Sequence, residues 1–159
     1  LNSSPSIDAD EESSFIQSWV DLLKFFSEFE WAEKYHKLLL IRILVPRYGE
    51  DHLEVAEALD GLAQILHQEG KFAQAIQLYE KSIYVRTRLF GEKHGFVANS
   101  LYAMACLMYG QGKYAMALPL HEQVLLIRKQ VYGNHHSSVG ESLVSLAQLM
   151  QIQNKIEAS

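Results

Sequence analysis

Histidine is the residue type in this sequence best suited to bind a metal ion, and three of the seven histidines recur at a fixed interval. His52, His94 and His136 are spaced 42 residues apart. If the interval marks a stacked structural repeat, equivalent side chains lie roughly 10 Å or more apart, too far to share one ion. We therefore predict no metal site. Each histidine is instead expected to do a structural job at a joint, such as bonding an exposed helix end.

Nucleophilic catalysis is the other chemistry to consider, and Cys106 is the only cysteine. It can form no intramolecular disulfide, and no histidine and third residue accompany it as a triad requires. The carboxylate pair Glu50 and Asp51 is interpreted as helix N-terminal charge. Gly110 and Gly112 belong to a turn with no strand before it, not to a phosphate loop. We predict no enzymatic activity and no cofactor.

Composition limits the partners. The chain has 159 residues, of which 48% are apolar and 21% charged, as in soluble globular proteins. Its net charge of −5 argues against nucleic acid as a partner, and no apolar run approaches the length of a membrane span. The lone cysteine favours a reducing compartment, so we expect a cytoplasmic protein. Because the chain begins with Leu1, we interpret it as a piece of a longer protein.

Internal repetition is the main signal in the sequence. Tyr-Gly-Glu-Asp-His at 48–52 returns as Phe-Gly-Glu-Lys-His at 90–94 and as Tyr-Gly-Asn-His-His at 132–136. Gly-Lys-Phe-Ala at 70–73 likewise returns as Gly-Lys-Tyr-Ala at 112–115. The first unit aligns with the second at a shift of 43, and a single deletion near Arg42 restores the shift of 42.

Each unit has the pattern of two helices joined by a glycine turn. One face of the first helix repeats apolar residues at i, i+3, i+4 and i+7: Leu59, Leu62, Ala63 and Leu66, then Leu101, Met104, Ala105 and Met108, then Leu143, Leu146, Ala147 and Met150. We predict an all-α solenoid of three helix pairs plus a C-terminal capping helix. Residues 1–12 would form an acidic, polar linker. Residues 13–159 would form the solenoid, with repeats at about 13–51, 52–93 and 94–135 and the capping helix at about 137–153. Trp19 is expected in the core from its helical period. Trp31 lies near the turn between the helices of the first unit; we favour packing on Phe29, with an exposed contact residue as the alternative.

The helix pair with its Gly-Lys-Phe/Tyr turn resembles the tetratricopeptide repeat, and the 42-residue interval resembles the repeats of kinesin light chains and nephrocystin-like proteins. The Gly-x-x-His joints and the Leu-Ile-Arg ending at 126–128 carry the same resemblance, which covers about residues 13–157. It implies a right-handed α-solenoid that binds other proteins, with a role as an adaptor for cargo or complex assembly. Kinesin-light-chain repeats usually carry a peptide-gripping Asn; here those positions are Gln17, Asp60, Tyr102 and Val144.

The resemblance also implies that the first helices line a concave groove. The helical stripe beside the core stripe then supplies the candidate partner-binding residues: Ser14, Gln17, Asp21 and Lys24; Glu57, Asp60, Gln64 and His67; Asn99, Tyr102, Cys106 and Tyr109; Glu141, Val144, Gln148 and Gln151. The second set is acidic and the third aromatic. We expect a peptide or partner helix with basic and apolar parts, and Tyr102 and Tyr109 as its main anchors.

Two alternatives stay open. The repeats could form a structural or oligomerising scaffold that associates through Phe25, Phe26 and Trp31 of the divergent first unit. They could also be a sensor segment of a larger multidomain protein. The sequence does not decide the oligomeric state.

Overall fold

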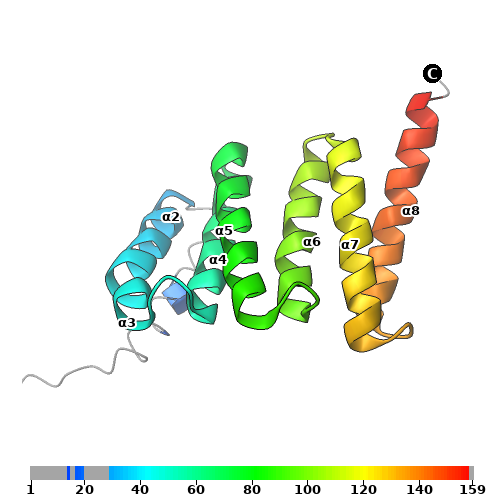
Figure 1. Cartoon of the computed structure of the whole chain (residues 1–159). Coiled ribbons are helices and arrows are strands. Elements are labelled where there is room, and N and C mark those ends of the chain that lie inside the picture. The colour runs from blue at the N-terminus through cyan, green and yellow to red at the C-terminus, as the bar shows by residue number, and fades with distance from the viewer. Residues whose placement is uncertain (1–13, 15–16, 20–28, 158–159) are drawn as a thin grey trace, which may run out of the picture. The chain divides into compact units, whose positions relative to one another are not determined.

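The computed structural model describes residues 14, 17–19 and 29–157, and within these ranges the chain is helical without any strand. The helices are α2 (Phe29–Leu38), η1 (Leu39–Leu44), α3 (Val45–Tyr48), α4 (Leu53–Gln68), α5 (Phe72–Phe90), α6 (Gly95–Gly110), α7 (Tyr114–Tyr132) and α8 (Ser137–Glu157) (Figure 1). The predicted all-α fold of paired helices is confirmed. None of the described helices is long and apolar enough to cross a bilayer. The chain divides into two compact units, Leu1–Leu78 and Tyr79–Ser159.

The first unit contains a π-helical segment at the place where the repeat spacing changes. α2 continues without a break into η1, which spans Leu39–Leu44, and then into α3. A single extra residue in a helix is accommodated as a π-bulge, because one turn then holds an additional residue. The first unit has one extra residue near Arg42, where the shift changes from 43 to 42, and η1 is the helical segment that accommodates it. The bulge lets the residues on both sides of it keep the positions they hold in α5.

The core of the first unit lies where α2 and η1 pack on α4. The predicted stripe of α4 is buried throughout: Leu59, Leu62, Ala63 and Leu66. His36 of α2 is also buried, and its ring approaches the backbone of α4 so closely that a Cβ on Gly61 would lie 2.5 Å from Nε2. Gly61 in the middle of a helix is thus explained by close packing of the histidine ring.

The two tryptophans do not pack inside as predicted. Trp19 and Trp31 are each about half exposed. The neighbouring Ala32 and the nearby His36 are buried, so they and not Trp31 face the core. The period-based prediction was wrong for Trp19, and for Trp31 the exposed alternative holds.

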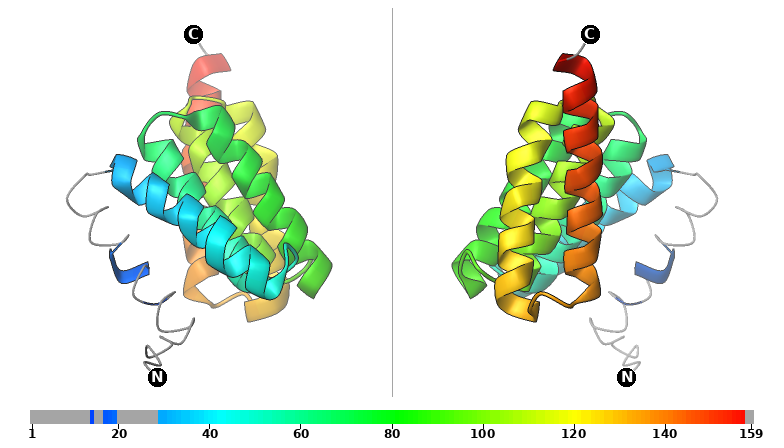
Figure 2. Two further views of the ribbon diagram at one scale, coloured as in Figure 1. Left: turned by 90° about the vertical axis from the view of Figure 1, so that its left-hand side faces the viewer. Right: turned by 90° about the vertical axis from the view of Figure 1, so that its right-hand side faces the viewer.

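In the second unit α6, α7 and α8 follow one another as antiparallel neighbours (Figures 1 and 2). The core between α6 and α7 consists of Val97, Ala98, Leu101, Val124 and Ile127.

At the joints the chain leaves each second helix through a glycine: Gly49 has φ 83° and ψ 173°, and Gly133 has φ 80° and ψ 167°. This region of backbone space is almost closed to other residues, so the glycines of the repeat motif are required by the backbone.

α8 differs from prediction in two ways. It extends to Glu157, four residues beyond the predicted end near residue 153. Leu143, Ala147 and Met150, predicted as core, are all exposed, Leu143 at 48% and Met150 at 50%; of the predicted set only Leu146 is buried. The counterparts of Leu143 and Met150 on α6, Leu101 and Met108, are buried, and α7 supplies the packing against Leu101. In the right-hand view of Figure 2 no described helix lies in front of α7 and α8, which leaves the equivalent face of α8 open.

Candidate protein-interaction surface

The joint histidines stack on the aromatic residue that ends the preceding helix. The ring centroids are 4.5 Å apart for Tyr48 and His52, and 4.7 Å apart for Phe90 and His94. The same 4.7 Å separates Tyr132 from His136. The motif aromatic-Gly-x-x-His therefore closes each joint by placing one flat ring on another.

Two of these histidines also bond the start of the next helix. Nδ1 of His94 accepts a hydrogen bond of 3.2 Å from the backbone N–H of Phe96. Nδ1 of His136 accepts one of 3.2 Å from Ser138. His52 instead lies 2.8 Å from the Glu54 carboxylate. The predicted role at exposed helix ends is confirmed for two of the three. No group of side chains suited to hold a metal ion occurs within the described ranges.

Arg86 and Arg128, which are 42 residues apart in the sequence, form a second set of joints that the sequence analysis did not predict. Arg86 Nη1 donates to the carbonyl of Phe96 and to Ser100 Oγ, both at 2.9 Å. Arg128 Nη1 donates to the carbonyl of Ser138 at 2.8 Å and to Ser142 Oγ at 3.0 Å. Both arginines are 5% exposed. Each therefore ties the end of one helix pair to the first helix of the next.

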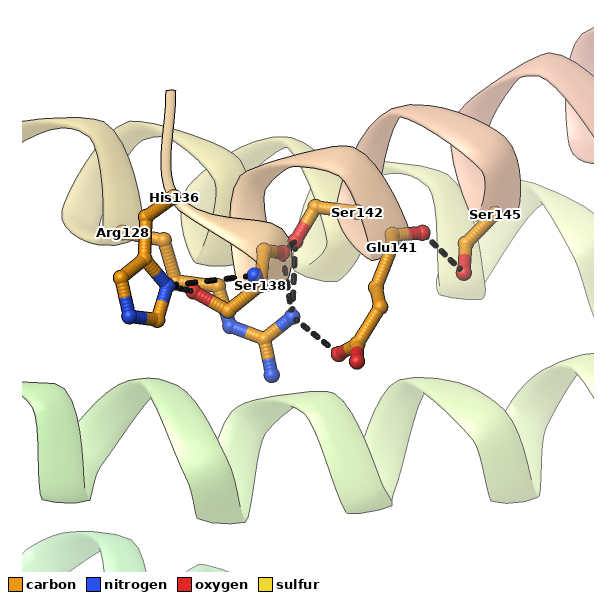
Figure 3. A network of polar contacts seen from close by, with 6 residues as sticks. All are labelled: Arg128, His136, Ser138, Glu141, Ser142 and Ser145. Carbon is orange, nitrogen blue, oxygen red and sulfur yellow. Dashed lines mark hydrogen bonds and ion pairs between the residues drawn. The ribbon is translucent and has the colours of Figure 1, made fainter. Parts of the chain in front are cut away.

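The Arg128 joint carries an additional carboxylate and reaches toward α6. Glu141 Oε2 lies 3.5 Å from Arg128 Nη1, within the network that Figure 3 shows around Ser138 and Ser142. On its other side, the guanidinium carbon of Arg128 lies 4.6 Å from the centroid of the Tyr102 ring, a cation–π geometry. The partly buried Tyr102 ring also meets His121 edge-on at 5.6 Å. Two residues of α7 thus fix the orientation of Tyr102.

Electrostatics in this cluster make nucleophilic chemistry unfavourable. Burial raises the pKa of the Cys106 thiol, a shift that Tyr102 and Arg128 oppose only in part. Burial, together with the charge of Arg128, lowers the pKa of His121. A thiol with a raised pKa is seldom ionised at neutral pH and is a weak nucleophile. The cluster can position an aromatic contact surface, but it does not activate Cys106.

The candidate stripe of the second unit lies at the surface. Asn99 is exposed, whereas Tyr102, Cys106 and Tyr109 are partly exposed. Tyr109 packs edge-on against Tyr114 with centroids 5.5 Å apart. On α8 the stripe is exposed at four positions: Glu141, Val144, Gln148 and Gln151. The structure brings the aromatic residues of α6 onto supporting side chains of α7.

The stripe of the first unit also avoids the core. Glu57 and Gln64 of α4 are exposed, and Asp60 and His67 are partly exposed. Gln17 and Glu57 share the lining of one surface hollow with Ser14, Glu54 and Tyr48. Ser14 is exposed and Gln17 partly exposed, while Asp21 and Lys24 lie outside the described residues. This surface is acidic, as the sequence suggested.

The comparisons with known proteins agree with this architecture. The sequence model of the tetratricopeptide repeat matches residues 29–83 and 54–129. No curated protein sequence matches the chain significantly. Among solved structures, BtubC (BKLC) from P. vanneervenii is similar with a TM-score of 0.82 and 21% identity, over 97% of this chain and 61% of that one.

A second similar structure comes from Podosopora anserina and is described as a kinesin light chain with nearly identical TPR-like repeats. Its TM-score is 0.78 at 17% identity, over 96% of this chain and 71% of that one. Of BtubC, by contrast, the chain spans 61%, which is less than two thirds of its length. At these identities the similarities show the fold, which is the one expected for repeats of the kinesin-light-chain type.

Proposed function

Because the chain belongs to the tetratricopeptide repeat family, whose repeats bind other proteins, we propose that the stripe on α6 and α8 holds a peptide segment or partner helix. The observation that carries the proposal is the support beneath Tyr102. Arg128 and His121 hold its ring in place while part of the ring stays open to solvent. An anchor that is already ordered loses little side-chain entropy when a partner binds.

The stripe of each unit suits a different kind of partner side chain. Tyr102, Tyr109 and Val144 in the second unit suit apolar side chains of the partner. Glu57 and Asp60 on α4 in the first unit suit basic ones. A role as an adaptor for cargo or complex assembly, in the cytoplasm, is part of this proposal and rests on the family resemblance and the single cysteine.

The proposal is tested by panning a random 16-residue peptide-display library on the whole chain and measuring the selected peptides with Tyr102 variants. Tyr102→Ala should weaken their binding about tenfold, corresponding to loss of a hot-spot ring. Tyr102→Phe keeps the ring and should bind within about twofold of the wild type. Because Tyr102 packs against the α6–α7 core, thermal melts must show that the Ala variant is folded at the assay temperature.

Met116→Ala is the matched control, since Met116 is an exposed apolar residue of α7 away from the stripe. It should leave affinity unchanged. The proposal fails if no selected peptide depends on Tyr102, or if Met116→Ala weakens binding as much as Tyr102→Ala.

Self-association is the second candidate function, favoured by the open apolar face of α7 and α8. Leu125, Leu126, Leu143 and Met150 line one surface hollow there. The alternative edge at Phe25 and Phe26 lies outside the described residues. Sedimentation equilibrium distinguishes the candidates: a ligand-independent dimer that Leu143→Lys converts to a monomer supports the scaffold.

A further inference from the structure

One side of α2 carries a row of exposed apolar residues that is separate from the proposed partner-binding stripe. Trp31, Tyr35, Leu38 and Ile41 are 49%, 38%, 44% and 70% exposed. Their spacing of four, three and three residues puts them on one side of the helix. With three basic residues they line a surface groove of about 530 Å³. We call this surface the α2 outer face.

Comparison with α5 shows that the fold does not require an apolar residue in place of Trp31 or Leu38. The shift of 43 pairs Ala32 with Ala75, and both are completely buried, so the two helices are in register. By the same shift Trp31 occupies the position of Gln74, and Leu38 that of Lys81; both α5 residues are exposed. The second helix of a repeat therefore folds with polar residues at these two positions. A contiguous exposed apolar patch of this kind is typical of a docking surface.

The charge around the stripe is positive although the whole chain carries −5. Lys34, Lys37 and Arg42 line the groove. Lys37 is paired with Glu33, but within the described part of the chain no carboxylate is paired with Lys34 or Arg42. Lys34 Nζ lies 5.0 Å from the centroid of the Trp31 ring, which places a cation beside the largest apolar side chain.

We propose that the α2 outer face binds an acidic amphipathic segment of another protein. The segment would place apolar side chains against Trp31, Leu38 and Ile41, and carboxylates beside Lys34 and Arg42. An anionic membrane offers related chemistry, but a concave groove fits the side chains of a peptide better than a lipid surface, and the chain's net negative charge opposes binding to such a surface.

The test is a second selection from the same display library, with counter-selection against the double variant Trp31→Gln/Leu38→Lys. This variant gives α2 the residues that α5 carries at these positions, which a folded second helix of this fold tolerates. Selected peptides should combine Asp and Glu with Leu, Phe or Trp at helical spacing. They should bind the double variant at least tenfold more weakly than the wild type. Lys34→Glu/Arg42→Glu should produce a comparable loss, and raising the salt concentration should weaken wild-type binding.

Tyr84→Ala is the matched control, because Tyr84 occupies on α5 the place of Ile41 and is 58% exposed. It should leave the affinity for the selected acidic peptides unchanged. Tyr102→Ala should also leave it unchanged, which distinguishes the α2 outer face from the proposed stripe on α6 and α8. Selection of neutral or basic peptides, or of none that depend on the double variant, overturns the proposal. Two further outcomes overturn it when no peptide is selected. In one, the wild type sediments with phosphatidylserine vesicles and the double variant does not. In the other, the wild type is a dimer and the double variant is a monomer.

Discussion

The guanidinium of Arg128 lies between Tyr102 of α6 and the first turn of α8, with its central carbon 4.6 Å from the centroid of the Tyr102 ring. The same group donates to the carbonyl of Ser138 and to Ser142 Oγ. The residue that joins α7 to α8 is therefore also the residue that orients the proposed anchor of the binding stripe. Stability of the joint and affinity for a partner are expected to depend on the same side chain.

Replacing Arg128 by Met should lower both quantities. The change removes two hydrogen bonds from a buried charged donor, and we expect a loss of about 1–3 kcal/mol in the free energy of unfolding. Urea denaturation measures it. The matched control is Lys129→Met on the next, exposed residue of α7, which should change stability by less than about 0.5 kcal/mol. Equal effects of the two substitutions would show that Arg128 does not hold the joint.

Gly61→Ala should destabilise the protein although alanine favours helices. A Cβ at this position would lie 2.5 Å from Nε2 of the buried His36, so the ring or the helix must shift, at a cost of about 1–3 kcal/mol. Gly140→Ala in α8 is the control, because nothing lies within 4 Å of its Cβ position. That variant should gain up to about 1 kcal/mol. Thermal melts of the two variants should move in opposite directions, and a shift in the same direction would contradict the packing.

Deleting Arg42 should be tolerated, since it removes the extra residue that η1 accommodates. The helix can then continue as an ordinary α-helix with the register of α5. Deleting the exposed Lys81 from α5 is the control. It rotates every later residue of that helix by about 100° and takes the buried Val85 and Arg86 out of their places. Circular dichroism should show a cooperative melt for the first deletion and loss of it for the second. The reverse result would mean that η1 has another cause.

Stability should depend on acid through Glu33. Hydrogen bonds from Lys37 and Lys71 lower the pKa of Glu33 from 4.5 to about 2. A lowered pKa means that the unfolded chain takes up the proton first, so the stabilisation is present above about pH 4.5 and is lost as pH falls toward 2. The free energy of unfolding should therefore decline more steeply between about pH 5 and pH 3 in the wild type than in Glu33→Gln. Parallel pH profiles would show that the carboxylate contributes nothing to the fold.

The fold could be predicted because the repeat constrains it at many equivalent positions. Leu59 and Leu101 occupy equivalent positions in successive repeats and both face a core. Gly49 and Gly133 are equivalent as well, and each follows the end of a helix with a positive φ. The open face at Leu143 was missed because periodicity assumes a following helix. For Trp31 the less favoured alternative, an exposed residue, proved correct, in agreement with the shift of 43, which pairs Trp31 with the exposed Gln74.

Arg128 illustrates a different limit. Its recurrence with Arg86 is visible in the sequence, but its direction is not, because a long side chain on a helix can reach solvent, the core or a neighbouring helix end. The stripe itself follows from helical spacing alone, and Asn99, Tyr102, Cys106 and Tyr109 all avoid full burial. Binding of a partner at this stripe is the central prediction.

The most direct test of the stripe uses a photo-crosslinker attached to an introduced cysteine in a Cys106→Ser background. A benzophenone maleimide on Asn99→Cys, an exposed position of the stripe, should, on irradiation, capture a peptide selected for its dependence on Tyr102. The same label on Glu122→Cys in the same background should capture little of it, since Glu122 is an exposed residue of α7 off the stripe. Capture that is equal at the two sites, or greater from position 122, would contradict the assignment of the stripe as the binding surface.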